Sequence, residues 1–285
     1  TEIYTLSLHD ALPIFYFRSM RKVAVIELLA ALLILVSCAK VPLTGRRQLN
    51  FIPDNMLTQM SLTSYQEFLS ANPPLPKNNS QAALVNQVGV KISQAVEEYL
   101  RQNNLSSKVG KFSWEFNLVE DPTVNAWCMP GGKVVFYTGI LPYTKDEAGL
   151  AVVMGHEIAH AVANHGGERM SQQLAVLLGG VSLDVALQKE PALTRDIFNA
   201  VYGVGSQLGT LAYSRTHEYE ADKLGMIFMA KAGYDPARAL SFWSDMAAIP
   251  GQAPPEFLNT HPSNSNRIKA IRDFIPEANK YLKNQ

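Results

Sequence analysis

Hydrophobic residues recur at helical spacing over most of the chain, so the sequence predicts a predominantly helical protein. The expected helices cover residues 54–69, 80–100, 170–187, 194–210, 217–232, 238–249 and 266–282. Prolines at positions 73, 74 and 76 separate the first two, because no helix can pass through such a cluster. Residues 38–53 are expected to form an extended lead-in linker with a turn at 44–47.

One stretch, residues 111–119, alternates strictly between hydrophobic and polar positions. Its hydrophobic face is formed by Phe112, Trp114, Phe116 and Leu118. This period of two predicts a half-buried antiparallel strand. A second strand is expected at 133–137, after a Gly-Gly turn. The predicted fold class is therefore α+β, predominantly α-helical, with a small mixed or antiparallel sheet.

The stretch Val153-Met154-Gly155-His156-Glu157-Ile158-Ala159-His160 places two histidines and a glutamate in an apolar helix. Each helical residue turns by about 100°, so His156 and His160 lie one turn apart and can bind one cation. Glu157 lies beside them, where it can exchange protons with a metal-bound water. The alternative is an exposed helix that carries two histidines by chance. We expect one zinc ion per chain, on a helix that begins at a capping box from Thr144 to Glu147.

Two histidines leave a tetrahedral zinc one protein ligand short. Glu218 and Asp222 are four residues apart on one helical face, so Glu218 can complete the coordination and Asp222 can orient a ligand imidazole. The alternative is a pair of solvated carboxylates, which is what we expect of Glu220. His165 is expected to point away, near a helix end. Cys128 is expected to be a small buried side chain.

The HExxH motif and the residues from Glu218 to Asp222 resemble metallopeptidase family 48, the gluzincins that include HtpX-like and CAAX-prenyl-protease-like enzymes. Shorter matches to the same family are Asn125-Ala126-Trp127, Pro130-Gly131-Gly132, Tyr137-Thr138-Gly139 and His261-Pro262 with Arg267. The resemblance implies a zincin-like (gluzincin) catalytic domain over residues 54–285. It is greatest with the soluble bacterial lipoprotein members, because the chain lacks the transmembrane helices of the multi-span members.

This resemblance and the motif residues together predict a mechanism of peptide hydrolysis. Zinc on the three ligands would lower the pKa of a bound water toward about 7, and Glu157 would take its proton during attack on the carbonyl. Our first choice to stabilise the oxyanion is His261, with Tyr213 and Arg267 as alternatives. For His261, a role in packing or in blocking the metal stays open.

The expected substrate site is an extended pair of segments before the metal helix, formed by Asn125, Ala126 and Trp127 and by the strand that contains Val135. In zincins such a strand lies at the sheet edge beside the zinc, where an extended substrate joins it through main-chain hydrogen bonds. Unfolded chains offer such strands and folded domains do not. We therefore expect a quality-control endopeptidase that acts on unfolded or damaged proteins. The alternative is a non-proteolytic holdase with a structural zinc, in which Glu157 would have no role.

The start of the chain predicts export. Residues 1–19 resemble translated adapter sequence and are expected to be a non-native extension. Residues 20–37 have a basic start and an apolar run, typical of a signal peptide, and they end in Leu35-Val36-Ser37-Cys38, which resembles a bacterial lipobox. Cys38 is therefore the expected site of lipidation.

A single membrane span is the alternative to a lipid anchor. The apolar run at 23–36 is 14 residues long and contains Glu27, whereas a span needs roughly 20 residues. Ala39 and Lys40 follow Cys38, with no aspartate of the kind that the resemblance to lipoproteins associates with inner-membrane retention. The resemblance therefore implies the outer membrane, with the protein facing the periplasm. The formal net charge of zero gives no support to nucleic-acid binding.

Overall fold

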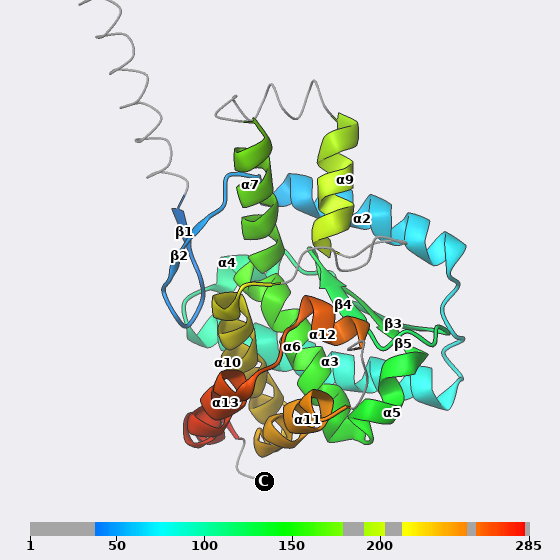
Figure 1. The fold of residues 1–285 in the computed structure, drawn as a ribbon, viewed down its shortest axis with the longest axis vertical. Helices are drawn as coiled ribbons and strands as arrows, with labels where there is room; N and C mark the ends of the chain where they lie inside the picture. Colours follow the sequence, from blue (N-terminus) through cyan, green and yellow to red (C-terminus); the bar gives the residue numbers. More distant parts are fainter. Residues whose placement is uncertain (1–37, 179–190, 203–212, 250–254, 283–285) are drawn as a thin grey trace, which may run out of the picture.

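The computed structural model describes residues 38–178, 191–202, 213–249 and 255–282, which are mostly helical (Figure 1). The helices are α2 (Asp54–Ala71), α3 (Ser80–Gln102), α4 (Ser106–Val109), α5 (Leu141–Thr144), α6 (Glu147–Ala163), α7 (His165–Leu178), α9 (Pro191–Tyr202), α10 (Arg215–Lys231), α11 (Ala237–Ala247), α12 (Glu256–Thr260) and α13 (Ser265–Ala278). Two short 3-10 helices in the described part of the chain are η1 (Thr138–Ile140) and η3 (Asn279–Tyr281). The predicted α-helical α+β class is confirmed.

The predicted helices agree with these elements where the structure describes them. Those at 54–69, 80–100, 217–232, 238–249 and 266–282 are confirmed, with ends shifted by a few residues. The later parts of the helices expected at 170–187 and 194–210 lie outside the described residues, as do the expected extension and signal peptide at 1–37. No helix in the described part combines the length and hydrophobicity of a membrane span.

A three-stranded sheet packs beside the helices in the order β3 (Glu115–Val119), β5 (Lys133–Tyr137), β4 (Ala126–Met129). The middle strand β5 runs parallel to β3 and antiparallel to β4. The prediction that the stretch 111–119 pairs antiparallel is therefore wrong. Alternation reports which face of a strand is buried, and it carries no information about the direction of the neighbouring strand.

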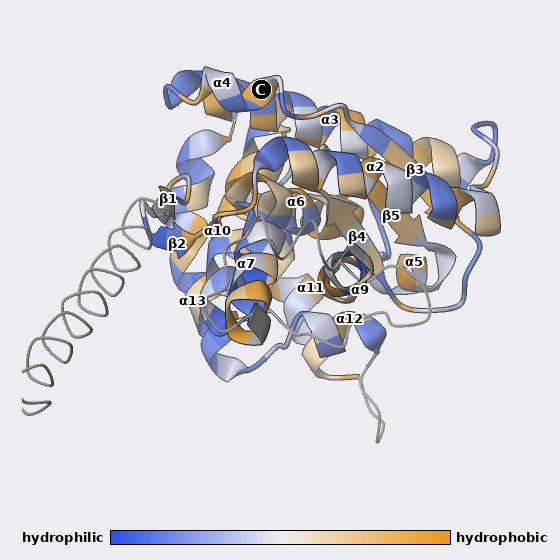
Figure 2. Ribbon diagram, turned by 90° about the horizontal axis from the view of Figure 1, so that it is seen from above, coloured by the Kyte–Doolittle hydropathy of each residue, from blue (hydrophilic) through white to orange (hydrophobic). Residues whose placement is uncertain are grey.

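The segment expected as a lead-in linker forms a hairpin of β1 (Cys38–Lys40) and β2 (Arg47–Leu49). Its extended character and its turn are as predicted, but it is packed on the domain. Val41 and Ile52 are each only 2% exposed, and β2 contacts α7. The hairpin lies beside α7 and α10 in both ribbon views (Figures 1 and 2).

Helix α6 lies at the centre of the molecule and is buried along nearly its whole length. It contacts α3, α10, α11 and strand β4. The helix begins at Asp146, whose side chain accepts a hydrogen bond from the Gly149 amide at 2.7 Å. The predicted capping box with Thr144 is wrong, because the Thr144 hydroxyl donates backward to the Leu141 carbonyl at 2.9 Å.

Helices α6 and α10 lie in close contact at two glycines. A Cβ on Gly155 would lie 2.9 Å from the Gly225 carbonyl oxygen, and a Cβ on Gly225 would lie 3.0 Å from the Gly155 carbonyl carbon. Only glycine leaves room for backbones this close. Glu218 and Asp222 share a face of α10 with Gly225 because of their i, i+4, i+7 spacing. The close crossing therefore brings both carboxylates to the histidines of α6.

We predict that Gly155→Ala destabilises the protein, because the new methyl group would press on backbone rather than on a mobile side chain. Overpacking of this kind costs about 1–3 kcal/mol, more than the better helix propensity of alanine restores. Chemical denaturation in excess chelator would measure the free energy of unfolding. Gly110→Ala is the control, since a Cβ there has nothing within 4 Å. Equal stability of the two variants would contradict the close crossing.

Candidate metal centre

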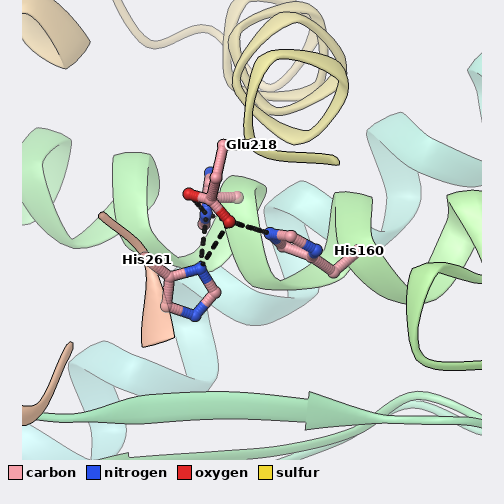
Figure 3. Close-up of side chains that lie close together, drawn as sticks. His160, Glu218 and His261 are labelled. Carbon is pink, nitrogen blue, oxygen red and sulfur yellow. Dashed lines mark hydrogen bonds and ion pairs between the residues drawn. The ribbon is translucent and has the colours of Figure 1, made fainter. Parts of the chain in front are cut away.

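Three elements bring four buried donors together: α6 supplies His156 and His160, the first turn of α10 supplies Glu218, and His261 follows α12 directly. None of the four is more than 3% exposed. Figure 3 shows the Glu218 carboxylate between the imidazoles of His160 and His261. The structure therefore joins the three predicted ligands, although they come from helices far apart in the sequence.

The distances between these donors are close to, and mostly slightly shorter than, those between ligand atoms of a tetrahedral metal ion. Nε2 of His156 lies 3.1 Å from Nε2 of His160 and 3.1 Å from Nδ1 of His261. Glu218 Oε1 lies 3.4 Å from His160 Nε2 and 3.1 Å from His261 Nδ1. Metal–ligand bonds of about 2.0–2.2 Å would place tetrahedral ligand atoms roughly 3.3–3.6 Å apart. Three ring nitrogens that converge in this way cannot all hydrogen-bond to one another, whereas one cation satisfies them together.

The electrostatics of the cluster also favour a cation. Burial lowers the pKa of His160 well below its ordinary value, so its imidazole is neutral and offers a lone pair. Burial acts in the same direction on His156, but hydrogen bonds with Asp222 and Glu218 outweigh it and raise that pKa to about 9. The cluster therefore stabilises positive charge at its centre, which is what a divalent metal supplies when bound.

His261 occupies the position of a fourth ligand. Its Nδ1 lies at ligand distance from His156 and Glu218, and its Nε2 lies 3.4 Å from Glu157 Oε1. The expected role as an oxyanion stabiliser does not match this arrangement, because the ring stands where a metal-bound water would be. The sequence predicts that His261 belongs to the site, but it does not predict on which side of the metal position the ring lies.

Asp222 orients His156, as the helical spacing predicted. Its Oδ1 lies 3.0 Å from His156 Nδ1, on the opposite side of the ring from the metal-facing nitrogen. Arg267 in turn donates to both oxygens of Asp222, at 2.7 and 2.8 Å, and pairs with Glu218 at 2.7 Å. Arg267 is only 1% exposed, and its guanidinium lies 3.5 Å from the centre of the Trp243 ring. The expectation that Arg267 could stabilise an oxyanion is wrong, since its donors hold these carboxylates.

His165 points toward the site, and the prediction that it points away is wrong. Its Nδ1 lies 3.0 Å from His160 Nδ1, and its Nε2 lies 3.1 Å from Glu220 Oε2. Asn164 ends α6 in a left-handed conformation, with φ of 57°, so the chain turns and His165 begins a new helix. Burial lowers the pKa of His165 to about 4, which keeps the imidazole neutral.

Glu220 was expected to be solvated and is buried, at 4% exposure. Its partners are His165 and two residues of the hairpin turn, Thr44 and Arg46. The hairpin also reaches Glu168 on α7, which Arg46 binds through two hydrogen bonds of 2.8 and 2.7 Å. None of these partners was predicted, because they lie in segments whose meeting only the tertiary fold determines.

Glu157 is 3% exposed, and its Oε1 has no hydrogen-bond partner among the described residues. Burial raises the pKa of this carboxyl group. His261 Nε2 lies 3.4 Å from Glu157 Oε1, too far for a strong hydrogen bond. A buried carboxylate oxygen that accepts no hydrogen bond is costly unless a function retains it. Cys128 is buried, as predicted, and the metal cluster among the described residues does not include it.

Strand β4 is an edge strand of the described sheet and packs against α6, as predicted for the substrate strand. Asn125, Ala126 and Trp127 are buried as whole residues, at 4%, 2% and 6% exposure, so their side chains are not presented to a substrate in this structure. Val135 is wrong as a substrate residue. It lies in the middle strand β5, paired on both sides and 0% exposed.

An HExxH helix, a glutamate ligand on a second helix and a small mixed sheet define a zincin-like metallopeptidase domain of the gluzincin type. Residues 87–275 match the model of peptidase family M48, and the chain belongs to this family.

Two relatives illustrate the range of the family. The mitochondrial metalloendopeptidase OMA1 of Schizosaccharomyces pombe is 34% identical over 246 residues, which cover 84% of this chain and 66% of the relative. The putative beta-barrel assembly-enhancing protease of Vibrio cholerae is 33% identical over 172 residues, covering 57% of this chain and 35% of the relative. The chain thus spans about two thirds or less of the length of these relatives.

We predict that the chelator-stripped protein binds one zinc ion per chain and that Glu218→Ala and His160→Ala each abolish this binding. Asp222→Asn should weaken it by about 10- to 100-fold, because the lost hydrogen bond frees the ring of His156. Isothermal titration would measure stoichiometry and affinity, with the exposed Asp245→Asn as a matched control. Full zinc occupancy in Glu218→Ala would refute the ligand set.

Proposed function

We propose that the protein is a zinc-dependent endopeptidase. The observation that carries this proposal is the buried carboxylate of Glu157 beside the metal cluster. Its Oε1 makes no hydrogen bond among the described residues and lies 3.4 Å from His261 Nε2. A zinc ion bound by His156, His160 and Glu218 would supply an activated water and a polarised carbonyl. The relatives named metalloendopeptidase or protease support the same reaction class.

The protein's own residues then have distinct roles. Glu157, whose pKa is raised by burial, takes the proton of the attacking water and returns it to the leaving amine. Tyr213 is the remaining candidate to donate to the oxyanion, since the centre of its ring lies 4.0 Å from the centre of the His160 ring. Burial raises its pKa to about 12, so its hydroxyl keeps its proton and can donate. His261 must leave its ligand position before water can enter.

The proposed substrates are unfolded or damaged proteins. At the edge strand β4 a peptide can be held by its main chain, and such hydrogen bonds do not depend on sequence. A folded domain keeps its backbone groups paired and cannot offer such a strand without opening. This supports a role in protein quality control in the bacterial cell envelope.

A rival function is supported by one observation, the fourth donor His261. Four protein ligands without an open position are typical of structural zinc sites, which a non-proteolytic holdase would need for stability alone. Under that hypothesis Glu157 has no role, whereas endopeptidase activity requires it. Substitutions of Glu157 and His261 therefore distinguish the two functions.

We predict that Glu157→Gln keeps its zinc but loses cleavage of unfolded casein by about 10²- to 10⁴-fold, because the amide cannot accept the proton. The exposed Glu67→Gln is the matched control. His261→Ala should retain zinc on the three remaining ligands. Absence of proteolysis by the wild type, or loss of zinc in His261→Ala, would favour the structural role. Full proteolysis by Glu157→Gln would refute Glu157 as the base.

We propose further that Cys38 carries a lipid that anchors the protein to the outer membrane, where it faces the periplasm. The support is the lipobox-like sequence before Cys38. Cys38→Ser should move the protein from the membrane fraction to the soluble fraction without loss of peptidase activity, since a lipid stays outside the folded core. Fractionation followed by immunoblotting would measure this. Membrane attachment that persists in Cys38→Ser would instead indicate an anchor at 23–36.

A further inference from the structure

The turn of the β1–β2 hairpin inserts Arg46 between two carboxylates of different helices. Arg46 donates from Nε to Glu220, at 3.1 and 3.0 Å to its two oxygens, and from both terminal nitrogens to Glu168. Thr44 adds a hydrogen bond to Glu220 at 2.5 Å. The side chains of Glu168 and Glu220 are each only 5% exposed, whereas that of Arg46 is 25% exposed. The hairpin thus supplies the cation for a buried acidic pair.

One arm of this network continues to the metal centre. Glu220 Oε2 lies 3.1 Å from His165 Nε2, and His165 Nδ1 lies 3.0 Å from Nδ1 of His160, whose other nitrogen faces the metal position. A carboxylate only accepts hydrogen bonds, so His165 must carry its proton on Nε2. In a neutral ring this leaves Nδ1 of His165 as an acceptor, and His160 must donate to it from Nδ1. The lone pair of His160 is thereby directed to Nε2.

His156, the other metal-binding histidine of α6, is held by a similar set of hydrogen bonds. There Arg267 binds Asp222, and Asp222 accepts from His156 Nδ1 at 3.0 Å. Both carboxylates belong to α10, and both arginines come from segments at opposite ends of the described chain. Each histidine of the HExxH motif is thus connected to an arginine through a carboxylate. For His160, the imidazole of His165 lies between the histidine and the carboxylate.

We propose that Arg46, Glu220 and His165 are positioning residues through which the N-terminal hairpin fixes the proton placement and ring orientation of His160, and so sets metal affinity. This proposal rests on the metal centre described above. It assigns the hairpin a function beyond packing. Hydrogen-bonded partners of metal ligands typically contribute about 10- to 100-fold in metal affinity.

The hairpin has other contacts that hold it in place. Val41 and Ile52 are each 2% exposed, so removal of the Arg46 guanidinium leaves the hydrophobic contacts of the segment intact. A change in metal affinity in Arg46→Ala would therefore reflect the polar network rather than release of the hairpin. Arg47 is the matched control, because its side chain is exposed and makes no hydrogen bond or ion pair within the described residues.

Two substitutions of His165 divide the network at different points. Asparagine places an amide oxygen near the position of Nδ1, so His165→Asn keeps the acceptor for His160 and loses Glu220. Glutamine places its amide near Nε2, so His165→Gln keeps Glu220 and loses His160. We expect zinc affinity to fall about 10- to 100-fold in His165→Gln and by less in His165→Asn.

The decisive experiment combines both sites in a double-mutant cycle on the full chain. Zinc affinity would be measured by chelator competition, and ligand geometry by the visible spectrum of the cobalt(II) protein. Arg46→Ala should weaken zinc binding several-fold in the wild type and have no further effect in His165→Asn, because the connection is already cut. Arg47→Ala should bind zinc like the wild type, and Arg46→Lys should fall between, since an ammonium cannot bridge both carboxylates as the planar guanidinium does.

Two results would overturn the proposal. Equal weakening by Arg46→Ala in both backgrounds would mean that its effect passes through the fold in general. Unchanged zinc affinity and cobalt spectrum in His165→Gln would mean that His160 needs no partner. Circular dichroism would verify folding, and Arg46→Lys gives the same test if Arg46→Ala does not fold. Zinc affinity and the cobalt spectrum do not depend on proteolysis. A negative result would therefore refute the role of the hairpin without refuting the endopeptidase function that Glu157→Gln tests.

Discussion

The structure depends on how acidic side chains are neutralised at the contact between α6 and α10. Helix α10 carries Glu218, Glu220 and Asp222, all of them at most 5% exposed. A buried carboxylate is costly unless a cation or several donors compensate it. The compensating groups are Arg46, Arg267, the imidazoles of α6 and His165 of α7. For Glu220, hydrogen bonds with His165, Arg46 and Thr44 outweigh burial and lower the pKa to about 2.

This requirement explains why distant segments converge on one place. The N-terminal hairpin and helix α13 each contribute one arginine, and each arginine bridges two carboxylates. Arg267 also donates to the carbonyls of His261 and Pro262, both at 3.2 Å, so it fixes the segment that carries the fourth donor. The catalytic geometry is thus a by-product of charge compensation among four chain segments.

Helical periodicity predicts those parts of the site that a single helix determines. The spacing within α6 and α10 was enough to predict that His156 and His160 share one face of their helix, and Glu218 and Asp222 one face of theirs, because helical periodicity fixes which side chains share a face. The structure brings these two faces together. Periodicity failed at His165, where extrapolation of the same helix ignored the turn at Asn164. It failed again at Glu220 and Val135, because their neighbours are set by segments that meet only in the folded chain. Helical periodicity could not reveal Arg46 as a partner of the site.

The metal centre also has a topological consequence for the chain as a whole. His156 and His261 are 105 residues apart, and Glu218 and His261 are 43 residues apart, so one bound ion would close long loops much as a disulfide does. In the unfolded chain the same ligands would have to close loops of this length to hold the ion, so the ion binds the folded chain preferentially and stabilises it by its binding free energy. Removal of the ion would therefore destabilise the folded chain, in addition to removing the metal that the proposed hydrolysis needs. The availability of metal would then govern how long the folded chain persists, independently of what it cleaves.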